Sequence, residues 1–570
     1  MKTAVTIIVA GLLLMLLGIG QRTVWAPAET VTAGVAQDVE AGPVTVIEPG
    51  VRGDAAGPVE VTVEADGPFT LAVGRASDVE AWVGDAAHLS VTGRGEETLD
   101  SAFSDGEDSV PDPSGSDLWI AEESGDGSLT YRWSEPTQGD WALLLAADGE
   151  APAPTRVSVT TPNDQSTPFA LPLVIGGALV VVLGIALLLI SSRRPGNGSR
   201  PEPVEGTRAY ARRHAGSSGG ASRIAAPGAV LLVAGLVGSG SILGVGPSTA
   251  TATPAPAPSS AAAVNGAPSA GSKASGPPVV LDVQLERILG AVASTVADAD
   301  AAADAKLLGP RVDGAALDLR TGAYAVRAKD TKAEAPAPVA ASPLLLDMVP
   351  TGTQWPRTVV ALTQGEGNPV PQALLLVQES PRENYRLTSA VQMLPGSTFP
   401  SPPAPGATGS VPTEDPGALA TAPQAAVASI ADFLTKPTGP NAETFEENSF
   451  AEAITRFQGD VVADPGNRAA KITFTHTAQE DRTRALMTGD GGAMVFGYLT
   501  HTYSSVPKSR GDTIDLKGTV YQALTGKTAS GKGIDVNYGE AVMMYVPPAG
   551  SEDKIRVIGA AQQLLSATLR

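Results

Sequence analysis

One run of more than twenty residues, from Pro168 to Ile190, contains no charged side chain and is almost entirely apolar. A helix rises about 1.5 Å per residue, so a run of this length is enough to cross the hydrocarbon core of a bilayer. We therefore expect a transmembrane helix at residues 168–191. This assignment constrains the rest of the chain, because every other segment must then lie on one side of a membrane or the other.

The residues that follow this run are strongly basic. Seven arginines lie in residues 192–223, against Glu202 and Glu205. Short cytoplasmic loops carry an excess of Lys and Arg, so we predict that residues 192–223 form a cytoplasmic Arg-rich loop.

A second uncharged run, residues 224–246, follows the arginines and is interrupted by Pro227 and several glycines. We interpret it as a transmembrane helix that returns the chain outward. A buried helix hairpin and an unfolded Gly/Ala-rich stretch are the alternatives.

The N-terminus has the layout of an export signal. Lys2 precedes an uncharged run from Thr3 to Gly20, and Trp25-Ala26 offers a small residue at a possible cleavage position. Residues 1–26 are therefore either a cleaved signal peptide or a retained signal anchor, which gives the chain two or three transmembrane helices. In both cases residues 27–167 are expected outside the cytoplasm.

Charge and cysteine content exclude several classes of function. The chain of 570 residues has a formal net charge of -21, and residues 27–168 hold 27 Asp and Glu against five Arg. Such an acidic exterior repels phosphate backbones, which disfavours nucleic acid binding. With no cysteine there is no disulfide, no Cys metal site and no thiol nucleophile.

Residues 27–167 show short alternating runs such as Val59–Glu64 and Arg156–Thr160, separated by Gly, Pro, Asp and Ser clusters. We predict an extracytoplasmic acidic β-rich domain resembling a β-sandwich, with no amphipathic helix of useful length. It holds four tryptophans, which we assign to core and edge packing in preference to a carbohydrate platform: Trp82, Trp119, Trp133 and Trp141.

An acid cluster in this domain offers oxygen ligands for Ca²⁺, which binds six to eight of them. The candidate ligands are Asp105, Glu107, Asp108, Asp112 and Asp117. Their spacing does not match an EF-hand loop, and a solvated acidic loop between strands explains the same residues. We therefore expect no cofactor and no bound metal, and keep these five acids as calcium candidates only.

Composition divides the rest of the chain. Residues 247–278 are rich in Pro, Ala and Ser with almost no charge, which predicts an extended linker. A second Pro/Gly/Thr-rich linker, residues 396–417, separates two units at 279–395 and 418–570.

The two units echo each other. Residues 385–394 align with 555–564 through matching Arg, Ala, Gln and Leu, although chance matching in Ala-rich sequence is the alternative. Each unit begins with helical periodicity and ends in strands, which indicates an α+β region of two helix-then-curved-sheet units. In the second unit we expect strands at 471–477, 492–504, 513–524, 539–546 and 554–565.

Helices followed by a long-stranded curved sheet, ending in a strand such as Arg556-Val557-Ile558-Gly559-Ala560, resemble the nuclear-transport-factor-two-like (SnoaL-like) fold. Together with an export signal, membrane segments and an Ala/Pro tether, the chain also resembles uncharacterised envelope proteins of actinobacteria. The export signal, the two apolar runs and the Arg-rich loop between them predict a multi-pass cell-membrane protein with both large domains extracytoplasmic. That fold serves catalysis, ligand binding and assembly alike, so it does not select an activity.

Two histidines of the second unit lie in predicted strands, His476 beside Ile472 and Phe474 on one face, and His501 beside Leu499 and Tyr503. If the strands pair, one histidine could act as a base with Asp481 or Glu480 nearby, and Tyr498 is a further candidate for the pocket. A hydrogen-bonded core histidine is the alternative reading.

The sequence thus favours a non-enzymatic, membrane-anchored envelope protein that binds or scaffolds protein partners beside a lipid bilayer. An exported enzyme with a pocket at His476, His501, Tyr498 and Asp481 is the first alternative. A Ca²⁺-dependent adhesion module is the second.

Overall fold

The computed structural model describes residues 2–26, 28–53, 57–95, 97–134, 139–163, 167–192, 277–403 and 409–570. They fall into two compact units. One unit contains helices α1 and α3, and the other contains the β-rich parts of the chain. The predicted cytoplasmic loop, the return crossing and the Pro/Ala/Ser linker lie almost wholly outside the described residues.

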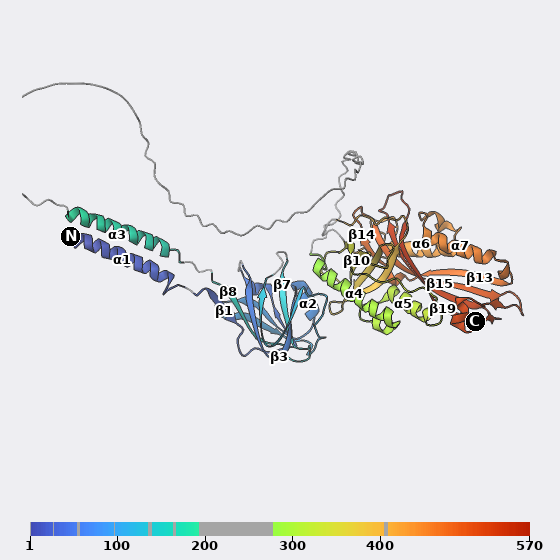
Figure 1. Cartoon of the computed structure of the whole chain (residues 1–570), viewed down its shortest axis with the longest axis horizontal. Coiled ribbons are helices and arrows are strands. Elements are labelled where there is room, and N and C mark those ends of the chain that lie inside the picture. Colours follow the sequence, from blue (N-terminus) through green and yellow to red (C-terminus); the bar gives the residue numbers. More distant parts are fainter. Residues whose placement is uncertain are drawn as a thin grey trace, which may run out of the picture. The chain divides into compact units, whose positions relative to one another are not determined.

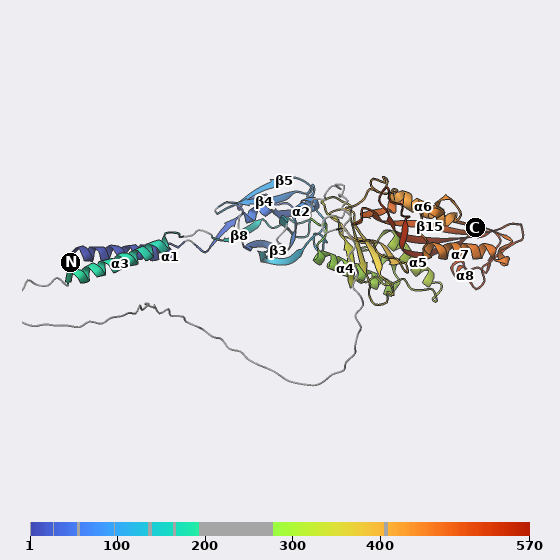
Figure 2. The same cartoon turned by 90° about the horizontal axis from the view of Figure 1, so that it is seen from above.

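Two helices in the first unit could span a membrane by their length and composition, α1 (Lys2–Arg22) and α3 (Ala170–Ser192). They lie side by side in both views of the molecule (Figures 1 and 2). The pair is antiparallel, because Gly11 contacts Val181 whereas Gly18, further along α1, contacts Val174.

Small residues recur every seven positions along the contact between α1 and α3. They are the buried residues Ala4, Gly11 and Gly18 on α1, and Ala170, Gly177 and Gly184 on α3. A Cβ atom added at Gly11 would lie 2.7 Å from Val181 Cγ2 and 2.8 Å from the Gly177 carbonyl oxygen. The two backbones therefore approach too closely for a larger side chain, as in small-residue contacts between transmembrane helices.

The β domain, residues 28–163, is a single strongly curved sheet with one helix. Its elements are β1 (Thr30–Gly34), β2 (Val44–Ile47), β3 (Val59–Arg75), α2 (Ala76–Val83), β4 (His88–Arg94), β5 (Leu99–Ser104), β6 (Ala121–Trp133), β7 (Trp141–Ala146) and β8 (Arg156–Pro162). The strand order is β1-β8-β3-β7-β2-β4-β5, with β6 paired to β3. A bridge between Gly34 and Thr98 connects the two ends of this order, so the sheet is barrel-like.

Two expectations for this domain are wrong: it is one sheet in place of a sandwich, and it contains a helix. Strand β3 is 17 residues long and pairs with β6, β7 and β8. A sandwich would divide these strands between two separate sheets, whereas here the one long strand joins them into a single sheet. Helix α2 is short, and its buried face, which includes Trp82, packs outside the barrel against Trp119. All four tryptophans of the domain are at most 2 % exposed, as core residues are.

The C-terminal region, residues 277–570, has helices before strands in each half. The first half contains α4 (Asp282–Ala302), α5 (Gly314–Arg327), β9 (Leu344–Met348), β10 (Arg357–Thr363), β11 (Gln372–Gln378) and β12 (Arg386–Met393). The second contains α6 (Pro423–Thr435), α7 (Ser449–Ala463), β13 (Ala470–Ala478), β14 (Arg484–Met487), β15 (Ala493–Pro507), β16 (Ile514–Asp515), α8 (Val520–Thr525), β17 (Ala529–Ser530), β18 (Ile534–Val546) and β19 (Arg556–Leu569).

Both halves contribute to one sheet. Its order is β13-β15-β18-β19-β12-β11-β10-β9, with β14 added to β15. The halves therefore meet through their last strands, where Gln392 opposes Ala560 and Met393 opposes Gly559. In both halves the strands follow chain order toward this seam, from β9 to β12 in the first half and from β13 through β15 and β18 to β19 in the second, which is the arrangement that a duplicated unit would give. The described parts of the predicted linker 396–417 pack on the second half, where Val411 donates to the Ala485 carbonyl.

The strands are buried on both faces. In β10, Val359 and Ala361 pack with helices α4 and α5, whereas Val360 and Leu362 pack with residues of β15 and β18 from the other half. A second core lies under α6 and α7. In Figure 1, α4 and α5 lie below these strands and α6 and α7 above them. Burial on both faces explains the continuous apolar runs in β10 and β11.

Candidate functional site

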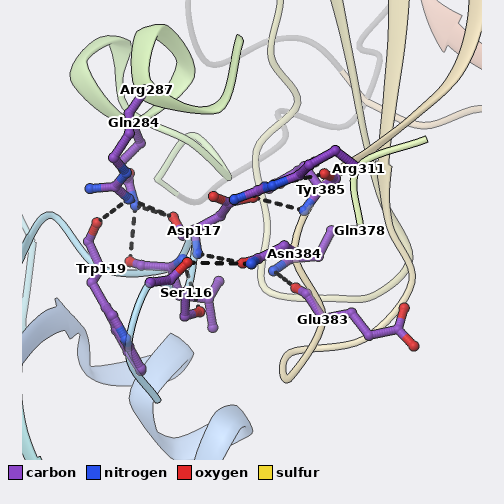
Figure 3. A network of polar contacts seen from close by, with 12 residues as sticks. Ser116, Asp117, Trp119, Gln284, Arg287, Arg311, Gln378, Glu383, Asn384 and Tyr385 are labelled. Atoms are coloured by element: carbon purple, nitrogen blue, oxygen red, sulfur yellow. Dashed lines mark hydrogen bonds and ion pairs between the residues drawn. The ribbon is translucent and has the colours of Figure 1, made fainter. Parts of the chain in front are cut away.

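The β domain and the C-terminal region contact each other through Asp117, a residue between β5 and β6 that is 2 % exposed. Its Oδ2 atom accepts hydrogen bonds from Arg311 Nη1 at 2.5 Å and from the Tyr385 backbone N–H at 2.8 Å. Its own N–H donates to Asn384 Oδ1 at 2.8 Å. Figure 3 shows these groups converging on the Asp117 loop. One buried carboxylate thus joins two segments of the C-terminal region to the β domain.

Helix α4 binds the backbone of the same loop. Gln284 Nε2 donates to the carbonyls of Asp117 and Leu118 at 3.0 and 2.9 Å. Arg287 Nη2 donates to the Trp119 carbonyl at 2.6 Å (Figure 3). These bonds satisfy loop carbonyls that the contact removes from water.

A second contact forms at helix α2. Arg357 Nη2 donates to Asp78 Oδ1 at 2.6 Å, with the two side chains 1 % and 3 % exposed. The Arg357 guanidinium also lies 3.8 Å over the Trp355 ring. Arg75 lies 3.8 Å from the other Asp78 oxygen, and burial lowers the pKa of Arg75 while Asp78 opposes that shift. Two guanidinium groups therefore share one buried carboxylate.

Arg382 completes this second contact at the end of α2. It donates to the Trp82 and Val83 carbonyls at 2.8 and 2.7 Å, groups of the last helical turn that lack helical partners. A cation at a helix C-terminus is also favoured by the helix dipole. The interface therefore combines charge pairing with helix capping.

The five calcium candidates do not gather into one site. Asp117 is committed to Arg311 and Tyr385, Glu107 lies 3.5 Å from Arg382, and Asp112 accepts from the Ser114 N–H. Asp105 and Asp108 are exposed. Within the described residues, the group of side chains able to hold a metal ion is a different one, His476, His501 and Glu540.

These three residues come from neighbouring strands of the C-terminal sheet. His476 of β13 lies directly opposite His501 of β15, and Glu540 of β18 lies opposite Leu499 of β15. The imidazole rings stack with centroids 4.0 Å apart. The side chains of His476, His501 and Glu540 are 0 %, 2 % and 0 % exposed, so the cluster is sealed from solvent.

Helices α6 and α7 hold His476 in place. Asn448 caps the start of helix α7, because its side chain accepts from the Ala451 N–H, and the buried face of the helix presents Gln458 inward. Gln458 Nε2 donates to the Leu434 carbonyl and lies 3.1 Å from His476 Nε2. The amide nitrogen is a donor, so Nε2 is the accepting nitrogen of His476 and Nδ1 carries the proton.

Glu540 receives the Nδ1–H of His476 at 2.9 Å on Oε2, and Gln562 Nε2 donates to Oε1 at 2.8 Å. Burial alone would raise the pKa of Glu540, but the contacts with His476 and His501 outweigh it and lower that pKa. Burial lowers the pKa of His476, although Glu540 opposes the shift. The cluster therefore contains a carboxylate anion beside a neutral imidazole.

Of the four predicted catalytic candidates, the structure brings His476 and His501 together. It places Tyr498 and Asp481 elsewhere. Tyr498 points to the opposite face of β15 from His501. Tyr498 and Asp481 line a separate cavity of about 240 Å³ with Arg482. Sequence reasoning missed Glu540, and the available signal was a lone carboxylate in the otherwise apolar stretch 538–546.

Comparison with protein families places part of the chain in a known family. The profile of the domain of unknown function DUF8094 matches residues 277–568, just over half of the chain. No curated protein and no solved structure matches the chain. The matched residues coincide with the C-terminal region of two halves and one sheet, and the chain therefore belongs to the DUF8094 family.

Proposed function

We propose that this protein is a non-enzymatic, membrane-anchored scaffold of the cell envelope, whose β domain and DUF8094 region act as one docked body that binds protein partners. The observation that carries the proposal is the buried polar interface around Asp117 and Asp78. Such an interface forms only when both parts share a compartment.

The interface bears on topology. The predicted crossing α3 separates the β domain from the DUF8094 region in sequence. If α3 spans the membrane, the chain must cross again before residue 277 for the two parts to dock. Residues 224–246, predicted from sequence as a return crossing, meet this requirement, and the Arg-rich loop 192–223 is then cytoplasmic.

The close contact of α1 with α3 supports a retained anchor in place of a cleaved signal peptide. Cleavage after Ala26 would remove α1 and expose the glycine surface of α3 to lipid. A retained α1 gives the chain three predicted crossings, two of which flank the β domain in the sequence.

The alternative of an exported enzyme has less support. Its predicted histidines are sealed beneath α6 and α7, and Tyr498 and Asp481 line a different cavity. A Ca²⁺-dependent adhesion module is likewise disfavoured by the pairing of Asp117 with Arg311.

The natural absence of cysteine allows a direct test of sidedness. Single cysteines are placed at exposed Asp126 in the β domain, at exposed Glu552 in the DUF8094 region, and at Ser199 in the Arg-rich loop. A membrane-impermeant maleimide should label the first two in intact cells, and Ser199→Cys only after permeabilisation. Protection of either exterior site would contradict the proposal.

Partner binding is tested by crosslinking in intact cells, with the wild type compared with an Asp78→Asn/Asp117→Asn variant. If the docked body is the binding unit, the variant should lose the crosslinked partners while remaining in the membrane. Identical adducts from both chains would show that docking is irrelevant to binding.

A further inference from the structure

Three side chains with metal-binding atoms meet where strands β13, β15 and β18 run side by side. One ligand atom from each of His476, His501 and Glu540 lies within 4.8 Å of the others. Two imidazole nitrogens and a carboxylate oxygen form a donor set that suits Zn²⁺ and related divalent transition metals. Neighbouring strands fix the spacing of these donors through the sheet register, without help from a loop.

His501 is the least satisfied member of the cluster. Its Nδ1 lies 3.1 Å from Glu540 Oε1 but outside hydrogen-bonding direction, and neither ring nitrogen has a hydrogen bond within the described part of the chain. A buried polar atom without a partner is costly, so an imidazole that is 2 % exposed is expected to have one. A metal ion between His501 and Glu540 would use this lone pair.

The charge of the cluster also favours a cation. The polar contacts of the Glu540 carboxylate are with His476, His501 and Gln562, none of which carries a permanent positive charge. Elsewhere in the molecule, buried Asp78 and Asp117 each pair with an arginine. A buried carboxylate without a lysine or arginine partner is stabilised by a bound metal ion in the same way.

We propose that His476, His501 and Glu540 bind one divalent transition-metal ion with the ligand preference of Zn²⁺, which fastens strands β13, β15 and β18 together. The role is structural, because the cluster is closed to solvent and to substrates. A tetrahedral ion takes a fourth ligand, for which a water molecule or an amide oxygen is suited.

Binding requires one change of ring orientation. The two imidazoles are stacked at an interplanar angle of 16°, so their in-plane lone pairs run side by side and do not converge. His476 is held by Gln458 and Glu540, whereas His501 has no hydrogen bond to break. His501 is therefore the ring that turns toward the ion.

Gln458 is a positioning residue for the site. To coordinate through Nδ1, His476 must carry its proton on Nε2, and the Gln458 amide must then turn its oxygen toward that N–H. Partners of this kind orient a histidine ligand, and their removal weakens metal binding by about 10–100-fold. Gln458→Leu should thus lower the affinity and leave the stoichiometry at one ion.

The test uses the full chain in detergent, purified without a histidine tag and stripped with a chelator. The wild type should bind one Co²⁺ with the visible absorption of a low-symmetry nitrogen and oxygen site. Zn²⁺ should displace the Co²⁺ and raise the melting temperature. Glu540→Gln and His501→Gln should abolish both effects.

His88→Gln is the matched control, since His88 lies in the β domain and its Nδ1 contacts the Ala86 carbonyl. This variant should bind Co²⁺ as the wild type does. The proposal is overturned if the wild type does not bind one ion per chain. It is also overturned if His501→Gln and Glu540→Gln still bind the ion. If the near-UV circular dichroism spectrum shows that Glu540→Gln is unfolded, the proposal is judged on the wild-type titration and on His501→Gln.

Discussion

The carboxylate of Asp78 accepts a hydrogen bond from Arg357 at 2.6 Å, although 279 positions separate the two residues in the sequence. A buried ion pair is a weak source of net stability, but removing one member leaves an uncompensated charge. The pair therefore favours this one docking arrangement of the β domain on the DUF8094 region, since any other close packing of the two surfaces would bury one of these charges without its partner.

Asp78→Asn should destabilise the docked body by about 3–5 kcal/mol. Arg357→Met should cost less, because Asp78 keeps Arg75 at 3.8 Å, whereas loss of Asp78 leaves two guanidinium groups without their carboxylate. Denaturant unfolding followed by tryptophan fluorescence measures the difference, since Trp82 and Trp119 pack beside the interface. Asp66→Asn, at an exposed ion pair with Arg156, is the control and should leave the curve unchanged. Equal losses for Asp78→Asn and Arg357→Met would contradict this reading.

Asp117→Ala should weaken docking, whereas Asp112→Ala should not. Alanine at position 117 leaves Arg311 and the Tyr385 N–H without their buried acceptor, an effect of about 2–4 kcal/mol. Asp112 is exposed and accepts one local bond from Ser114, so its removal should stay within about 1 kcal/mol. Limited proteolysis of the two variants reports the loss of docking. If Asp112→Ala were the more damaging change, the acidic loop would have a function that the interface does not explain.

Gly177→Leu should disrupt the pairing of α1 with α3. A Cβ at this position would lie 2.7 Å from the Gly11 carbonyl oxygen and from Met15 Cγ. The neighbouring Gly176 is the matched control, because nothing lies within 4 Å of its Cβ position. The melting temperature in detergent should therefore fall for Gly177→Leu and change little for Gly176→Leu. Mass spectrometry of the membrane-bound protein should find α1 still attached, and a chain beginning after Ala26 would refute the anchor.

Acid should destabilise the turn before β15 through Asp490. Burial would raise the pKa of Asp490, but hydrogen bonds from Thr488, Tyr545 and the Gly492 N–H outweigh it and lower that pKa. A carboxylate with a lowered pKa in the folded state contributes stability above its ordinary pKa, and the contribution is lost as the pH falls through the folded value.

Asp490→Asn should therefore be less stable than the wild type at neutral pH, and the two should converge in acid. Melting temperatures measured from neutral pH down into the carboxyl range give the comparison. Asp460→Asn, on the exposed face of α7, is the control, and its melting temperature should follow that of the wild type at every pH. A constant gap between Asp490→Asn and the wild type at every pH would exclude titration of Asp490 as the cause.

Local sequence patterns predicted much of the fold. The apolar run after Pro168 forms α3, and the strands expected at 471–477 and 492–504 correspond to β13 and β15. The strand expected at 513–524 is wrong, because α8 occupies Val520–Thr525 within a turn-rich excursion. There Thr519 caps the helix, a local hydrogen bond that outweighs the alternating pattern.

The candidate site was only half predictable. Period-two alternation placed His476 and His501 on one face of their strands, and the register confirms that they meet. It could not bring Glu540 to them, because the order β13-β15-β18 depends on which strands pair across long separations. The interface at Asp117 and Asp78 was equally hidden, since charge complementarity between distant segments leaves no local pattern.

The seam between the two halves has a consequence for synthesis. Strand β19 lies inside the sheet, between β18 and β12, and β12 can pair with it only after more than 150 further residues have been made. Until then β12 is an open edge, the kind of surface that nascent chains use to aggregate. The edge of β12 is therefore covered only once β19 has been made, so a chain cut short between these two strands would be expected to aggregate through that edge.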